Sequence, residues 1–82
     1  MQKINSYTHI EINPGILVGK PVIKGTRIPV YVVLNLLAHD YTPKRVVEAY
    51  PELTVKDVQA CLAYASDFLQ FQEEKEHSVG KY

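Results

Sequence analysis

The chain has 82 residues, enough for one domain, and its hydrophobic fraction of 46% is too high for a disordered chain. A single cysteine, Cys61, excludes an intrachain disulfide and is typical of a protein from a reducing compartment. No apolar run approaches the roughly 18 residues that a membrane-spanning helix needs, so we expect a cytoplasmic protein with no membrane partner.

The charges sum to zero but are unevenly placed along the chain. Residues 1–45 carry six basic and two acidic side chains, a net charge of +4, whereas residues 46–82 carry three basic and seven acidic ones, a net charge of −4. Such asymmetry permits a surface that binds a polyanion even at zero net charge. Chance segregation of charges on a small protein would give the same pattern, so both interpretations stay open.

The first part of the chain predicts a short β-hairpin. Residues 8–12 alternate with a period of two, which is typical of a half-buried strand. Residues 13–15 (NPG) favour a turn, because Pro presets one backbone angle and Gly accepts a positive φ. Val22 and Ile23 then predict a second strand, which ends at Lys24.

The stretch GKPVIKGTRIPV (residues 19–30) contains the glycine and lysine residues that a phosphate-binding loop needs. The nucleotide-binding form requires G-x-x-x-x-G-K-[ST], in which the backbone N–H groups and the Lys converge on one phosphate. Here five residues separate Gly19 from Gly25, and Lys24 precedes the second glycine instead of following it. We therefore expect a turn followed by a helix rather than a nucleotide site.

Within that turn, Thr26 is expected to hydrogen-bond to the backbone, and Pro29 to begin a helix. Arg27 is needed for neither role. It is a candidate to contact DNA phosphate or a protein partner, or to pair with an acidic group inside a dimer, and Lys20 and Lys24 beside it are further candidates for DNA binding.

Two helices are predicted after Pro29. The first has apolar residues at the spacing i, i+3, i+4, i+7 and ends at Asp40-Tyr41; its apolar positions are Val30, Val33, Leu34 and Leu37. The second begins after Thr42, a favourable N-cap, and ends near Tyr50, which precedes a proline.

A third and longer helix follows. Thr54 and Asp57 have the spacing of a capping box at its start. Its apolar face is expected to comprise Val58, Cys61, Leu62, Ala65, Phe68 and Leu69. Residues 72–82 are polar and are expected to form a flexible tail, which leaves residues 1–71 as a single domain.

No constellation of residues indicates catalysis or metal binding. His9, His39 and His77 are 30 and 38 residues apart and show no ligand spacing, and Cys61 lies on an apolar helix face, where a small buried side chain is expected. We therefore expect no enzyme, cofactor, metal or small-molecule ligand; a small-molecule sensor or an enzyme is the weakest interpretation.

The second and third helices, joined by a short turn, are typical of a helix-turn-helix unit, whose second helix enters the major groove. Lys44 and Arg45 occupy the first turn of the second helix, where a positive charge opposes the helix dipole by about 0.3–1 kcal/mol. A DNA phosphate would offset that cost, although exposed Lys and Arg are also good helix formers. On the third helix, Lys56 and Gln59 can reach base edges.

The amount of apolar side chain also predicts an interface. Tyr64, Phe68 and Phe71 provide more aromatic surface than a three-helix core would fill, so they are candidates for contact with a partner or a second copy. A monomer with so few DNA-reading residues should bind weakly, and useful binding would require two half-sites and hence a homodimer.

A series of short motifs runs from residue 8 to residue 66: I-x-I, P-G-I, G-K-P-V-I-K-G-T-R-I-P-V, T-P-K-R-V-V, Y-P-x-L-T and D-V-x-A-x-L-x-Y-A. In this order they resemble the domain-of-unknown-function family numbered 433. The resemblance implies a homeodomain-like or winged helix-turn-helix domain. Family members usually end the first helix with Gly, whereas this chain has Asp40-Tyr41, so that turn is expected to differ.

The resemblance also implies a role as the antitoxin of a type II toxin–antitoxin pair, next to a PIN-like ribonuclease toxin. Our leading hypothesis is therefore a mainly α-helical antitoxin that binds its toxin and, as a dimer, represses the shared operon. The alternative hypothesis is a protein-interaction module that masks a partner with little or no DNA binding.

Overall fold

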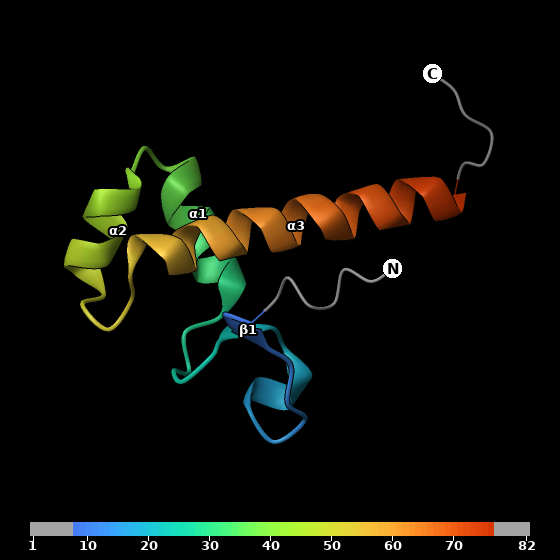
Figure 1. Cartoon of the computed structure of the whole chain (residues 1–82), viewed down its shortest axis with the longest axis horizontal. Helices are drawn as coiled ribbons and strands as arrows, with labels where there is room; N and C mark the ends of the chain where they lie inside the picture. The colour runs from blue at the N-terminus through green and yellow to red at the C-terminus, as the bar shows by residue number, and fades with distance from the viewer. Residues whose placement is uncertain (1–7, 77–82) are drawn as a thin grey trace.

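The computed structural model of the protein describes residues 8–76 and consists of a short β-hairpin followed by three helices (Figure 1). This confirms the mainly helical fold with an N-terminal hairpin. The elements in chain order are β1 (Ile10–Glu11), the 3-10 turn η2 (Leu17–Gly19), β2 (Val22–Ile23), α1 (Val30–Ala38), α2 (Pro43–Ala49) and α3 (Val55–Glu76).

The hairpin is antiparallel, with Ile10 opposite Ile23 and Glu11 opposite Val22. Its first strand is shorter than the sequence pattern over residues 8–12 suggests. Val22 and Ile23 are both fully buried although neighbouring strand residues point to opposite faces, so β2 is covered on both sides. The hairpin is therefore part of the core and not an exposed appendage.

The connection between β1 and β2 contains a left-handed turn that no sequence pattern predicted. Leu17, Val18 and Gly19 have consecutive positive φ values of 51°, 57° and 81°. For L-residues this conformation costs about 1–2 kcal/mol each, and Val18 is also β-branched. The preceding turn at 13–15 forms as expected, but without a positive φ at Gly15. The Asn13 carbonyl oxygen accepts the Ile16 N–H at 2.8 Å, and the Asn13 side chain accepts the Gly15 N–H at 2.8 Å.

The turn from β2 to α1 has the expected structure. Gly25 adopts a φ of +84°. Thr26 donates its hydroxyl to the carbonyl oxygen of Ile23 at 2.7 Å and accepts the Ile28 N–H at 2.9 Å. Pro29 is the extended residue before α1. This stretch is thus a turn and the start of a helix, as its sequence indicates.

The end of α1 is closed by a left-handed aspartate. Asp40 has a φ of +71°, the Asp40 N–H donates to the carbonyl oxygen of Leu37 at 3.3 Å, and the Tyr41 N–H donates to that of Leu36 at 3.1 Å. These two bonds make a Schellman motif, in which Gly is the usual left-handed residue. The chain therefore keeps the turn that a glycine would make and places an L-residue in it.

Both predicted caps are present. The Thr42 hydroxyl accepts the Arg45 N–H at 3.1 Å at the start of α2. At the start of α3, the Thr54 hydroxyl accepts the Asp57 N–H at 3.2 Å, and Asp57 Oδ2 accepts the Thr54 N–H at 2.9 Å. These bonds fix where the two helices begin, and hence the angle at which the chain passes from one to the other.

One hydrophobic core joins the hairpin and all three helices. It is formed by Ile10, Ile23, Val30, Val33, Val46, Leu53, Val58 and Cys61. The core takes only the first part of the α3 face that the sequence assigns to it, because Leu62, Phe68 and Leu69 are 47%, 48% and 58% exposed. The second part of α3 extends past α1 and α2 (Figure 1).

Helix α3 also continues to Glu76, into the segment that was expected to be a flexible tail from residue 72. Gln, Glu and Lys are good helix formers, and the run after Phe71 consists of these residues alone, so nothing in it stops the helix. Residues 77–82 lie outside the described residues, and the division at residue 71 stays a prediction.

Candidate functional site

The first candidate site is the start of α2, where Lys44 and Arg45 are exposed. The Arg45 guanidinium lies 4.5 Å from the centre of the Tyr41 ring, a cation–π contact that holds the side chain at the surface. Pro43 has no N–H, and Thr42 accepts that of Arg45, so few backbone donors of this turn are left for an anion. Any phosphate bound here would be held mainly by the two basic side chains.

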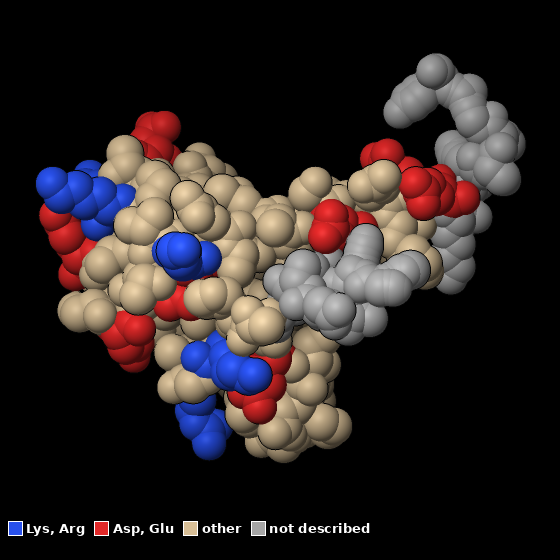
Figure 2. Space-filling view, in the orientation of Figure 1, with Lys and Arg blue, Asp and Glu red and all other residues tan. Residues whose placement is uncertain are grey.

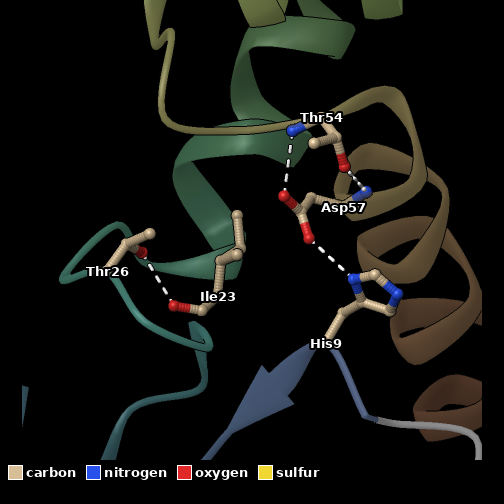
Figure 3. A network of polar contacts seen from close by, with 5 residues as sticks. All are labelled: His9, Ile23, Thr26, Thr54 and Asp57. Carbon is tan, nitrogen blue, oxygen red and sulfur yellow. Dashed lines mark hydrogen bonds and ion pairs between the residues drawn. The ribbon is translucent and has the colours of Figure 1, made fainter.

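The second candidate site is the start of α3, where Lys56 and Gln59 are exposed. Asp57 between them turns away into the capping box. Its Oδ1 lies 2.7 Å from Nδ1 of His9, the residue before β1 (Figure 3). Partial burial opposes the ionisation of Asp57, but hydrogen bonds from Thr54 and His9 outweigh it, so its pKa lies below the ordinary value of 3.8.

Asp57 has the predicted capping role and in addition contacts His9. A free carboxylate at the start of a recognition helix would repel the DNA backbone, whereas this one is bound to Thr54 and His9. His9 was not identified from the sequence as a partner, and no local signal could have identified it, because 48 residues separate the two side chains.

The third candidate group, Lys20, Lys24 and Arg27, is exposed beside the hairpin. The Lys20 ammonium lies 5.4 Å from the centre of the Tyr31 ring. In Figure 2, basic side chains gather over α2 and over the hairpin loops, with one near the start of α3, and acidic side chains lie among them. On this face, therefore, basic side chains form separate groups and no continuous basic surface.

The aromatic candidates lie along α3. Tyr64 and Phe68 stack with ring centres 6.4 Å apart, and burial raises the pKa of Tyr64. Both line a groove of about 390 Å³ between α3, α1 and the segment before β2; the other lining residues are Lys20, Pro21, Val30, Tyr31, Leu34, Ala65 and Leu69. Phe71, which is 59% exposed, lies beyond the groove lining. The sequence analysis missed the contributions of α1 and Lys20 to this surface, since contacts between separate elements leave no local pattern.

Cys61 is fully buried in the core, and burial together with the negative charge of Asp57 raises the pKa of its thiol to about 11. Among the side chains of residues 8–74, no three His, Cys, Asp or Glu are grouped so that they could hold a metal ion. Within the same residues, no helix combines the length and apolar character needed to cross a membrane.

Residues 10–65 match the family described as "Protein of unknown function (DUF433)". The chain belongs to this family. The matched segment contains every core residue, the N-caps of α2 and α3 and the turn that closes α1. The match therefore covers the fold as well as the motifs.

The chain is also similar to two further proteins. It is 40% identical over 53 residues to the "Uncharacterized protein y4eO" of Sinorhizobium fredii (strain NBRC 101917 / NGR234), a match over 65% of this chain and 24% of that protein. It also resembles the crystal structure of a DUF433 member protein from Anabaena variabilis ATCC 29413, with a TM-score of 0.70 and 28% identity over 82% of this chain and 66% of that one. The chain therefore spans about a quarter of the first protein and just under two thirds of the second.

Proposed function

We propose that the protein is a DNA-binding antitoxin that represses its own operon in the cytoplasm and has no catalytic role. The observation that carries the proposal is the pair of capped helices α2 and α3, joined by residues 50–54 and bearing exposed basic side chains at the start of each. Leu53, which is 2% exposed, anchors the link in the core, so the two helices are held at a fixed angle as a helix-turn-helix requires.

In this proposal the side chains divide between two tasks. Lys44 and Arg45 bind phosphates, which sets the affinity and its dependence on salt. Lys56 and Gln59 reach base edges and so determine the sequence preference. Because Asp57 is bound to Thr54 and His9, its charge is directed away from the DNA backbone.

The test of the DNA role is a mobility shift with the region upstream of the protein's own gene, at low and at physiological salt. Replacing both Lys44 and Arg45 by Ala should weaken binding to every sequence and reduce the slope of log K against log salt by about 2, one for each lost phosphate contact. The matched control is Lys44→Arg with Arg45→Lys, which keeps both charges and should retain binding. Absence of any shift at low salt, with or without a partner protein, contradicts the DNA role.

The antitoxin part of the proposal rests on family membership and concerns a PIN-like ribonuclease as the partner. It is tested by expressing the chain together with the product of the adjacent gene. The two should purify as a complex, and the chain should relieve the growth arrest that the adjacent product causes alone. A partner that neither binds nor is neutralised contradicts this part.

The second candidate function is a protein-interaction module that masks a partner with little or no DNA binding. The apolar groove and the exposed Phe68 and Phe71 favour it, because such surface is suited to protein and not to DNA. A stable complex with the adjacent gene product, combined with no mobility shift under any salt condition, would favour this function over the first.

A further inference from the structure

The C-terminal half of α3 extends away from the core (Figure 1), and it exposes large apolar side chains. Phe68, Leu69 and Phe71 are 48%, 58% and 59% exposed. Three large apolar side chains exposed within four residues at one end of a helix are characteristic of an interface, since a solvated helix end does not need them.

Phe68 lies on the continuation of the buried face of α3. Val58, Cys61, Ala65, Phe68 and Gln72 follow one another at intervals of three and four residues, the spacing of a seam between packed helices. Exposure is zero at Val58 and Cys61, intermediate at Ala65 and 48% at Phe68. The seam therefore continues past the point where α1 covers it, and its shape is suited to another helix.

The groove lies along the same seam. Tyr31 and Leu34 of α1 form its second wall, and Lys20 is part of its lining, with its ammonium over the Tyr31 ring. The lining is almost entirely apolar apart from this one charge. An occupant should accordingly bring apolar side chains for the floor and a negative charge for Lys20.

We propose that the occupant is the α3 helix of a second copy, and that two chains pair with their α3 helices antiparallel. The C-terminal half of α3 combines exposed Phe68 and Phe71 with exposed Glu73 and Glu74, which is the chemistry that the groove requires. Antiparallel pairing brings this acidic end to Lys20 of the other chain, whereas parallel pairing would bring the two acidic ends together. The contact is isologous, each copy giving its helix end and receiving the other.

The area available is sufficient for a concentration-dependent dimer. Tyr31, Phe68, Leu69 and Phe71 are about half exposed. These four side chains of roughly 200 Å² each, together with the groove walls, would bury about 600 Å² on each copy. The total of about 1,200 Å² lies at the lower end of specific protein interfaces. The role of the dimer rests on the proposed function, because two paired recognition helices read two half-sites of DNA. Formation of the dimer itself needs no DNA.

The test is sedimentation velocity on the full chain without DNA, over a range of concentrations. The chain should change from monomer to dimer with increasing concentration, and Phe68→Glu should remain monomeric throughout while keeping its circular dichroism spectrum. The matched control is Ala63→Glu, which adds the same charge at an exposed position on the other side of α3 and should dimerise as the parent does.

The orientation of the helices is tested by charge reversal. Lys20→Glu should raise the dimer dissociation constant roughly three- to tenfold, and adding Glu73→Lys to the same chain should restore it, as a double-mutant cycle detects.

A chain that stays monomeric at its highest soluble concentration, or a dimer that Phe68→Glu leaves intact, overturns the proposal. If the chain is monomeric and Phe68→Glu instead abolishes binding of the adjacent gene product, the surface belongs to that protein. Because the sedimentation experiment contains no DNA and the mobility shift is a separate measurement, the dimer and the DNA role can be contradicted independently of each other.

Discussion

The two halves of α3 have the same apolar spacing but different surroundings. Val58 and Cys61 in the first half are fully buried, whereas Phe68 and Phe71 in the second are about half exposed. The cause is length: α1 and α2 have nine and seven residues, about 14 and 10 Å, against 22 residues and about 33 Å for α3. A periodic pattern thus identifies the apolar face of a helix, but the neighbouring elements decide how much of that face becomes core.

The comparison predicts that truncation to Ala has unequal effects on stability in the two halves of α3. Val58→Ala removes two methyl groups from a fully buried site and should lower the free energy of unfolding by about 2–3 kcal/mol, through lost burial and a cavity. Urea denaturation measures it, at a protein concentration low enough to keep the chain monomeric.

The matched control is Leu69→Ala on the second half of α3. It removes more carbon, but Leu69 is 58% exposed, so the loss should be below about 1 kcal/mol. Equal losses for the two variants would mean that the second half of α3 is as well packed as the first, which would remove the difference on which the comparison rests.

The buried thiol of Cys61, in the first half of α3, should make the free energy of unfolding depend on pH in the alkaline range. The pKa of Cys61 is raised from 9.0 to about 11, so above pH 9 the unfolded chain releases this proton while the folded chain retains it. This contribution to stability is complete below pH 9 and decreases as the pH rises, by up to about 2 kcal/mol near pH 11. Cys61→Ala should lack this component, so unfolding free energies of the two proteins should converge between pH 9 and 11. Parallel curves would show that the thiol is not protected.

The hydrogen bonds of Asp57 at the beginning of α3 should contribute less to the free energy of unfolding than the buried residues of this helix do. Their contribution should depend on pH in the acid range. Asp57→Ala removes the capping box and the contact with His9, which should cost about 1–2 kcal/mol at neutral pH. Because the folded-state pKa of Asp57 is below 3.8, its contribution is present above that pH and is lost as the pH falls through the folded value. Parent and variant should therefore converge in acid. His9→Ala, which leaves the capping box intact, should cost less than Asp57→Ala.

These contacts show which parts of the structure could be predicted from the sequence. The caps at Thr42 and Thr54 and the Thr26 turn join residues two or three positions apart, so their spacing alone indicates them. The family motifs cover the same local features. The contact of His9 with Asp57 depends on how the hairpin packs against α3, and no spacing encodes it.

The candidate site was predicted less completely than the fold. Tyr64 and Phe68 follow from the apolar surplus of α3, but the groove they line also needs Tyr31 and Lys20, which lie on other elements. The left-handed residues Leu17 and Val18 were missed for another reason, since neither has the residue type that usually adopts a positive φ.

The smallest expected effect concerns Asp40, which occupies the left-handed position where a Schellman motif usually has glycine. Asp40→Gly should stabilise the protein by about 0.5 kcal/mol, because relief of the left-handed backbone is partly offset by the greater entropy of glycine in the unfolded chain. Asp40→Ala, which keeps a Cβ and has no side-chain oxygen, should destabilise it instead. Thermal unfolding of the three proteins should therefore rank Gly above Asp above Ala.

The turn at Asp40 closes α1 and sets where α2 starts, so the change acts on the covered half of α3 and should leave the dimer dissociation constant unaltered. A change in that constant would mean that the two halves of α3 are coupled through the body of the domain, and that the boundary between core and interface is less sharp than the exposures indicate.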